Sequence, residues 1–162
     1  MDYRVAFDVA QSGYQGWHAP VRVLWAVGFG VVLAALRTTL AARLPRYATA
    51  YGIVAFGFLG LACLWLVISL FSTYIEYTGL VDAQETGQAL VVEGVVTDFT
   101  TVAGVGGARE RFCVRKMCFE YSDDVDTSAY HATSLHGGSV RLGLPVRVTY
   151  VRGAIVRLEV AD

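Results

Sequence analysis

The stretch that decides the fold runs from Tyr47 to Ile75 and reads YATAYGIVAFGFLGLACLWLVISLFSTYI. It holds 29 residues and no charged side chain, with Arg46 directly before it and Glu76 directly after it. A helix that crosses a bilayer needs about 20 apolar residues, so this stretch is long enough to span with some tilt. We therefore expect a transmembrane helix over residues 46–76 rather than the buried helix of a soluble core.

A shorter apolar segment precedes it, between Arg22 and Arg37. Its length alone is ambiguous, but both arginine side chains can extend toward lipid headgroups. One face carries small residues spaced four apart, a pattern that lets two helices approach closely. The sequence thus predicts a helical hairpin whose first helix covers 20–42; the alternative is one span preceded by an interfacial helix. The small residues are Ala26, Gly30 and Ala34.

The composition agrees with a membrane anchor. Hydrophobic residues make up 55% of the 162 residues, charged residues make up 17%, and the mean hydropathy is +0.49. Soluble domains carry about a quarter charged residues. The net charge of −1 gives no basis for nucleic-acid binding. Three cysteines are too few for a disulfide scaffold or a four-thiolate zinc site.

The basic residues predict an orientation. Three arginines precede the long apolar stretch. Between this stretch and Arg109, every charged side chain is a carboxylate. Because loops rich in arginine stay in the cytoplasm, we expect the C-terminal part on the periplasmic side of a bacterial inner membrane. Arg4 and Arg22 oppose this assignment in a two-span protein. The three arginines are Arg37, Arg43 and Arg46.

Beyond about residue 88 the pattern alternates as in β-strands, and loops with Gly or Asp separate the segments. The six short strands predicted in this part favour a small closed or nearly closed antiparallel β-barrel. The predicted fold class is an α+β membrane protein: residues 1–19 form an interfacial segment, 20–78 the transmembrane hairpin, 79–88 a linker and 89–162 the barrel. The predicted strands are 89–100, 109–114, 117–122, 130–134, 145–151 and 154–160.

Two hairpins have a predicted register. A two-residue turn at Arg115-Lys116 pairs Phe112 with Phe119 on one face, and Arg111 with Glu120 and Cys113 with Cys118 on the other. The last hairpin is expected to have a three-residue loop at 151–153, because a two-residue loop would set Val148 against Arg157. That register sets Val146, Val148 and Tyr150 opposite Leu158, Val156 and Ala154.

The opposed Cys113 and Cys118 leave three interpretations open. Their Cβ atoms are expected about 4.5–5.5 Å apart, so a small twist would allow a disulfide, which an oxidising periplasm favours. Two free thiols are the second interpretation. Redox catalysis is the third, and the CxxxxC spacing does not favour it. Cys63 lies within the long apolar stretch, where we expect a small buried hydrophobe.

Other polar residues give weak signals. His131 and His136 lie near the acidic run 123–126 but lack a known metal-ligand spacing, and the glycine-rich segment 103–107 lacks a P-loop pattern. We expect no catalytic, cofactor or metal site, and no enzyme activity. A basic patch for an anion or a partner is a further hypothesis, against the alternative of a solvated strand face. Its residues are Arg141, Arg147 and Arg157.

Four short stretches carry a resemblance to known proteins. They resemble a group of small bacterial membrane proteins of unknown role, in which spans precede a small barrel, and also NfeD-like proteins, whose soluble end is an OB-type barrel. The resemblance implies an OB-like β-barrel and a bacterial inner membrane, and it implies no active-site residue. The stretches are 119–123, 136–138, 143–151 and 155–159.

Three functions compete at this point. The first is a non-catalytic binding or accessory protein in the lipid bilayer, whose extracytoplasmic barrel engages a protein partner or forms a homo-oligomer. The second is a ligand-gated membrane effector with a cytoplasmic nucleotide-sensing barrel, a plan that resembles proteins of bacterial defence systems. The third is an immunity protein against a toxin that acts at the membrane.

Overall fold

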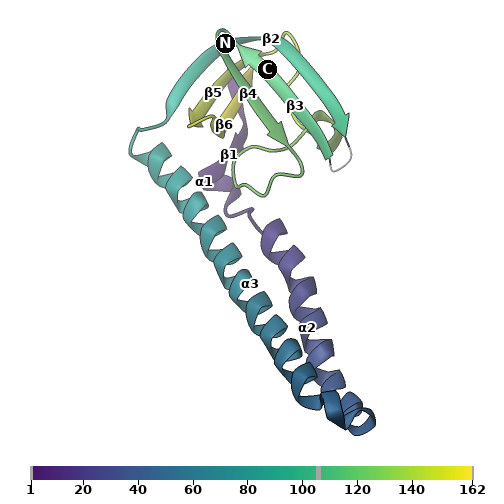
Figure 1. Ribbon diagram of the computed structural model, residues 1–162. Helices are drawn as coiled ribbons and strands as arrows, with labels where there is room; N and C mark the ends of the chain where they lie inside the picture. Colours follow the sequence, from purple (N-terminus) through teal and green to yellow (C-terminus); the bar gives the residue numbers. More distant parts are fainter. Residues whose placement is uncertain (1, 105–106, 162) are drawn as a thin grey trace. The chain divides into compact units, whose positions relative to one another are not determined.

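The computed structural model describes residues 2–104 and 107–161. The chain forms two compact units: a sheet unit of Met1–Gly16 and Thr73–Asp162, and a hairpin unit of Trp17–Ser72. Each unit is described by itself below. The fold class is α+β, with two long apolar helices and one six-stranded antiparallel sheet (Figure 1).

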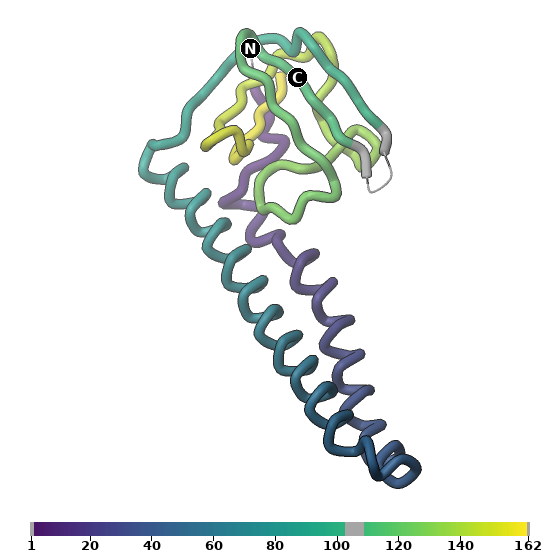
Figure 2. Tube along the Cα trace, viewed as in Figure 1, coloured from purple at the N-terminus to yellow at the C-terminus, as the bar shows by residue number. Residues whose placement is uncertain are grey.

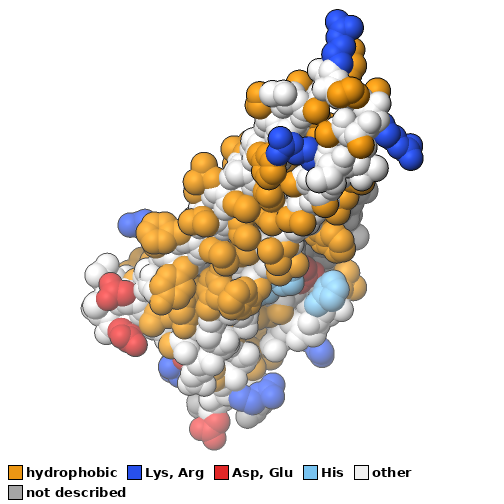
Figure 3. All heavy atoms as spheres, turned by 90° about the horizontal axis from the view of Figure 1, so that it is seen from below, with side chains coloured by type: hydrophobic (Ala, Val, Ile, Leu, Met, Phe, Trp, Pro, Cys, Tyr) orange, Lys and Arg blue, Asp and Glu red, His pale blue; other side chains and the backbone are white. Residues whose placement is uncertain are grey.

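The two long helices are the ones that the apolar segments predict. Helix α2 covers His18–Arg43, a 3-10 turn covers Pro45–Tyr47, and α3 covers Ala48–Glu85. Both are long and apolar enough to cross a membrane, and only 11% of the most apolar window of each is buried. Figure 3 shows hydrophobic side chains over the face of the two helices that is turned to the viewer. A core helix of a soluble protein would instead be mostly buried.

Within the hairpin unit, α2 and α3 approach closely at Gly30. A Cβ atom added there would lie 3.1 Å from Leu59 Cδ1 and 3.2 Å from Leu59 Cα. The hydroxyl of Tyr51 donates a hydrogen bond to the carbonyl oxygen of Leu33 over 3.0 Å. Gly30 is buried, and Ala26 and Ala34 are half-buried on the same helix. Of the predicted stripe, the structure thus places its central glycine directly on the partner helix.

Helix α3 extends nine residues beyond its predicted end, so the linker expected at 79–88 is mostly helical. Nothing in 77–85 breaks a helix, and Leu80 and Ala83 are buried. Leu80 belongs to a cluster with Val9 and Val156 in the sheet unit, which gives the last turns a surface to pack on. Gly87, with a φ of 72°, ends the run in a left-handed conformation that glycine adopts without strain.

The strands follow the order β1-β6-β5-β2-β3-β4, and every neighbouring pair is antiparallel. The long β2 pairs with β5 through Leu90–Val95 and with β3 from Val96 onward, after a register shift at 96–98. The strands are β1 Tyr3–Asp8, β2 Leu90–Gly104, β3 Gly107–Val114, β4 Met117–Ser122, β5 Pro145–Val151 and β6 Ala154–Ala161.

Strand β1 corrects the expectation for the N-terminus. Residues 3–8 pair with β6, and a short helix α1 covers Val9–Ser12, so this part belongs to the sheet unit and does not form a separate interfacial segment. Asp8 caps α1 by accepting a hydrogen bond from the N–H of Ala10, and its carboxylate lies 3.6 Å from Arg157. The alternation of Tyr3, Val5 and Phe7 with more polar neighbours is a strand signal that the sequence analysis did not use.

The predicted strand at 130–134 is not formed. Residues 123–144 instead make a long connection between β4 and β5, with one 3-10 turn at Ser134–His136, which Figure 2 traces. Within the segment 130–134, the N–H of Tyr130 donates a backbone hydrogen bond to the carbonyl oxygen of Ile155 over 2.9 Å, and at the end of the connection Gly143 and Leu144 bond to Val96 of β2. The segment has the composition of a strand because Tyr130 and Thr133 are buried, not because it joins the sheet.

The last hairpin has a shorter loop than predicted. Val151 pairs with Ala154 across a two-residue turn, in which Arg152 and Gly153 have φ values of 51° and 88°. The two-residue loop was wrongly rejected, because a shift in register between Thr149 and Tyr150 moves Arg157 opposite Thr149. Val148 therefore faces Leu158 and the apolar face is preserved, since the bulge restores the alternation.

The sheet is open: among the described residues no ladder joins the edge strands β1 and β4. An aromatic side chain fills part of the opening. The ring of Tyr130 lies 5.5 Å from the ring of Phe7 on β1 and 5.1 Å from the ring of Tyr121 on β4. All three belong to the main core cluster with Phe112 and Phe119. Side-chain packing thus joins the two edges where backbone pairing does not.

Candidate functional site

The β3–β4 hairpin has the register that the sequence predicts. Cys113 is opposite Cys118, and Phe112 is opposite Phe119 with both rings buried. Arg111 is opposite Glu120, although the side-chain ion pair of Glu120 is to Arg109, at 3.9 Å and with both groups exposed. The turn residue Arg115 adopts a φ of 55°, so a non-glycine residue takes the left-handed conformation there.

Glu110 on β3 is a buried carboxylate, only 1% exposed, that the sequence analysis did not single out. Its oxygens accept hydrogen bonds from the hydroxyl of Tyr121 and the N–H of Ser134, each over 2.8 Å, and from the hydroxyl of Ser134. These donors are neutral, and a buried carboxylate needs such donors in place of water. Glu110 thereby ties the long connection to the sheet.

Asp123 holds the same connection from the other side. It accepts hydrogen bonds from the N–H of Thr133 over 2.9 Å and from Nδ1 of His136 over 2.8 Å. Burial by itself raises the pKa of this carboxyl, but the bonds from Thr133 and His136 outweigh it and lower the pKa below its usual value. His136 and Asp123 thus form a structural pair, and within the described residues no group of three His, Cys, Asp or Glu is placed to hold a metal ion.

Two tyrosines of the main core cluster, Tyr121 and Tyr130, lie next to these hydrogen bonds. Burial raises the pKa of Tyr121 and of Tyr130, and for Tyr121 the bond to Glu110 adds to the effect. The hydroxyl oxygen of Tyr130 accepts a hydrogen bond from the N–H of Ser139 over 3.1 Å. Both hydroxyls stay protonated at neutral pH, and their bonds position the loop rather than activate a nucleophile.

A cavity of about 330 Å³ lies beside β4 and is formed entirely within the sheet unit. Glu120, Tyr121 and Ser122 line one side and residues 153–155 another. Its other lining residues are Glu76, Val125, Asp126, Thr127, Ala129, Tyr130 and His131. The lining has three carboxylates and one histidine, so we call it the acidic cavity; one of the three, Glu120, also pairs with Arg109, which is outside the lining.

A smaller cavity of about 190 Å³ also has Tyr130 in its lining, together with Phe7 of β1 and residues of the long connection. His131 lines both cavities, but its Nδ1 is within 2.9 Å of the carbonyl oxygen of Ala129. The sequence named His131 only as a weak metal ligand. The structure instead places it in the wall of two adjacent cavities.

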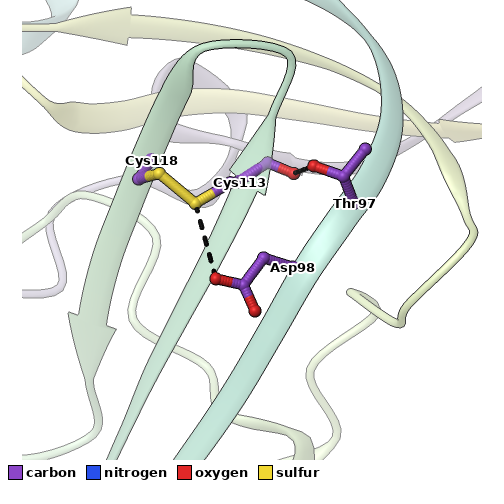
Figure 4. The surroundings of a disulfide bond; sticks show 4 residues. All are labelled: Thr97, Asp98, Cys113 and Cys118. Carbon is purple, nitrogen blue, oxygen red and sulfur yellow. Dashed lines mark hydrogen bonds between the residues drawn. A yellow bond between two sulfur atoms is a disulfide. The ribbon is translucent and has the colours of Figure 1, made fainter.

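The structure joins Cys113 and Cys118 by a disulfide, with Cα atoms 4.0 Å apart (Figure 4). Cys113 is buried and Cys118 exposed, and Asp98 Oδ2 lies 4.0 Å from Cys113 Sγ. A neighbouring carboxylate opposes formation of a thiolate, which catalytic cysteines need. Cys63 is exposed on α3, in contrast to the expected buried position.

Two of the three arginines of the predicted basic patch lie together, but they are matched by carboxylates. Arg147 lies 3.0 Å from Glu93, and Arg157 lies 2.8 Å from Glu159. Glu159 also contacts Arg147 at 3.6 Å, so one carboxylate links both arginines. Arg141 lies in the turn before β5, outside this set of ion pairs. The structure therefore forms a neutralised ladder across β2, β5 and β6 in place of a basic patch.

The remaining motif is the glycine-rich segment 103–107, of which residues 103 and 104 end β2 and residue 107 begins β3. Residues 105 and 106 of this segment are outside the described residues.

Comparison of the whole chain with models of protein families, with curated proteins and with solved structures found no significant match.

Proposed function

We propose that this chain is a non-catalytic accessory protein of a bacterial inner membrane. In this proposal α2 and α3 cross the bilayer, and the sheet unit, with an open OB-like sheet, lies on the periplasmic side and binds a protein partner. The resemblance to small membrane proteins of the NfeD-like type agrees with this plan. No residue role is taken from that resemblance.

One observation carries the proposal. Two long apolar helices are exposed along most of their length, while the sheet unit has a core of its own. Exposed apolar surface of this extent needs an apolar solvent, and a bilayer provides one. Arg37, Arg43 and Arg46 near the hairpin turn support a cytoplasmic turn, and the disulfide supports an oxidising compartment for the sheet unit.

The acidic cavity weighs against the nucleotide-sensing alternative. A nucleotide carries phosphate groups, which need arginine, lysine or a helix N-terminus for binding. The cavity beside β4 instead presents Glu76, Glu120 and Asp126.

Reporter fusions to the C-terminus test the location. If the sheet unit is periplasmic, a fusion to alkaline phosphatase should be active and a fusion to green fluorescent protein should not fluoresce. The reverse pattern would contradict the proposed location and favour the cytoplasmic sensor.

Cross-linking in intact cells, followed by purification in mild detergent, tests the partner. We expect one protein in a reproducible ratio with the full chain, and none with a control that retains only Trp17–Ser72. A strictly monomeric chain with no reproducible partner would contradict the accessory role.

A further inference from the structure

Strand β4 is an edge strand, and its outer side has unpaired backbone groups. In an antiparallel pair, closely spaced opposite residues do not exchange hydrogen bonds. Cys113 and Cys118, with Cα atoms 4.0 Å apart, form such a pair, and so does Arg111 with Glu120 two positions along. The N–H and C=O of Glu120 therefore point away from β3, and elsewhere among the described residues they have no backbone partner.

The acidic cavity lies along this same edge. Three consecutive residues of β4, Glu120 to Ser122, line it. Successive side chains of a strand point to opposite faces of the sheet. A cavity that contacts three consecutive residues therefore lies against the edge of the strand, where both faces can be reached. The opposite wall is the start of β6 at Ala154 and Ile155. The backbone of Glu120 and the space for a ligand side chain are thus side by side.

The charges and rings of the cavity select a cation. Glu120 and Asp126 stand in its lining together with Glu76, which accepts a hydrogen bond from the hydroxyl of Thr127 over 2.6 Å. That bond holds Glu76 at the wall. Tyr121 and Tyr130 add aromatic rings to the lining, and such rings attract guanidinium and ammonium groups that approach their faces.

We propose that β4 pairs with an extended segment of a protein partner and that a basic side chain of this segment enters the cavity. The backbone of the segment adds a strand at Glu120, and its arginine or lysine meets the carboxylates of the cavity. This mode of recognition takes affinity from main-chain hydrogen bonds and specificity from alternate side chains. It rests on the proposed function, since it names the kind of partner that the sheet unit binds.

The test uses the full chain in detergent and a seven-residue synthetic peptide of alternating valine and arginine, blocked at both ends. We expect saturable binding by calorimetry, and no binding of a peptide with glutamate in place of arginine. The triple variant Glu76→Gln, Glu120→Gln, Asp126→Asn is expected to bind the arginine peptide about tenfold more weakly. The matched control removes three carboxylates that do not line this cavity: Asp82→Asn, Glu85→Gln and Asp98→Asn.

Methylation of the peptide backbone tests strand addition without altering the protein. N-methyl groups on alternate residues in one phase remove the donors that face β4, and each lost bond is expected to weaken binding about fivefold. N-methyl groups in the other phase face away and leave binding unchanged. Equal effects in the two phases, equal binding to the triple variant, or no binding at all would each overturn the proposal.

The remaining outcomes separate this site from the proposed function. Self-association of the full chain in sedimentation experiments, lost in the triple variant, would show that the occupant is a second copy and would overturn the proposal. A cross-linked partner recovered equally with the wild type and the triple variant would retain the accessory function but overturn its assignment to β4.

Discussion

At the scale of single residues, two carboxylates decide how the connection between β4 and β5 folds. Glu110 and Asp123 together accept hydrogen bonds from both backbone and side-chain donors of Thr133 and Ser134. A hydroxyl-rich segment that loses these acceptors leaves buried N–H groups without partners, which costs more than the bonds themselves contribute. Sequence inspection finds the acidic residues but not their targets.

Asp123→Asn is expected to lower thermal stability near pH 7 and to flatten its dependence on acid. The folded-state pKa of Asp123 lies below the ordinary value of 3.8, so its stabilisation is complete above that value. The stabilisation is lost as the pH falls through the lower, folded-state pKa. The difference in unfolding midpoint between wild type and variant should therefore shrink below about pH 4. A constant difference down to about pH 2 would contradict the assignment; Asp124→Asn is the control in the same loop.

Gly138→Ala is expected to destabilise the sheet unit by about 2 kcal/mol or more. A Cβ atom at Gly138 would meet the carbonyl oxygen of Ala132 and lie 2.8 Å from the carbonyl carbon of Thr133. Both are backbone atoms, so the turn closed by the Gly138 N–H to Thr133 bond would have to open.

The matched control is Gly79→Ala, because a Cβ atom at Gly79 meets nothing within 4 Å. It should stabilise α3 by about 0.5–1 kcal/mol. Thermal unfolding of both variants in detergent measures the two effects, and equal midpoints would contradict the steric argument.

At the scale of elements, the strands owe their register to small irregularities. The bulge in β6 keeps Val148 opposite Leu158, and the shift in β2 lets one strand serve two partners. A bulge bends a strand and increases its twist. Alternation along a single strand does not reveal where such an extra residue lies.

We expect the protein isolated from cells to contain the disulfide between Cys113 and Cys118 of the β3–β4 hairpin. Under denaturing conditions without reductant, mass spectrometry after alkylation is expected to find one labelled cysteine, Cys63, and a label on all three after reduction. Labelling of three cysteines before reduction would support the free-thiol interpretation. Because the loop closed by Cys113 and Cys118 is short, the variant with alanine at both positions should lose at most about 2 kcal/mol of stability.

The contact between α2 and α3 predicts a strong effect of size at Gly30. Gly30→Leu places a branched side chain against Leu59, whose Cα would be 3.2 Å from the new Cβ, and should force the helices apart. We expect a loss of about 1–3 kcal/mol in detergent. Gly28→Leu on the same helix is the control, because a Cβ atom at Gly28 meets nothing within 4 Å. Equal unfolding midpoints for the two variants would show that Gly30 is not at a tight contact.

At the scale of the whole molecule, apolar surface is divided unequally between the two units. The sheet unit buries its large side chains around Phe112 and Phe119, whereas Trp25 and Trp65 of the hairpin unit are 81% and 62% exposed. The hairpin unit therefore depends on an apolar environment that the chain does not provide. This difference underlies the proposed membrane location.

Reversal of the charges at the hairpin turn should alter the orientation. In the triple variant Arg37→Glu, Arg43→Glu, Arg46→Glu, the turn loses the positive charge that favours the cytoplasm. We expect the activity of a C-terminal alkaline phosphatase fusion to fall severalfold at equal expression. Unchanged activity would show that these arginines do not set the orientation; Arg109→Glu in the sheet unit is the control for loss of a positive charge.

Much of the fold was predictable, and the errors have common physical causes. The two helices and the register of Cys113 with Cys118 are confirmed, because each follows from a local pattern. The strand at 130–134 and the loop at 151–153 were wrong, and two arginines of the predicted patch have carboxylate partners. Tyr130 bonds to Ile155 and Arg147 pairs with Glu93, which both come from other segments of the chain. The loop depends on the bulge in β6, which the alternation of the two strands does not reveal. The cavity beside β4 was not predicted, since its walls come from four separate segments.

By itself, the sequence determined two long apolar helices and a C-terminal set of antiparallel strands. Hydrophobic periodicity is a local property, and it is sufficient to distinguish a helix from a strand. Only the tertiary structure decided that β1 joins β6, that Tyr130 fills the opening between the edge strands, and that the edge of β4 borders an acidic cavity. These features arise where segments far apart in the chain meet. The alternation within one segment does not determine which other segments pack against it.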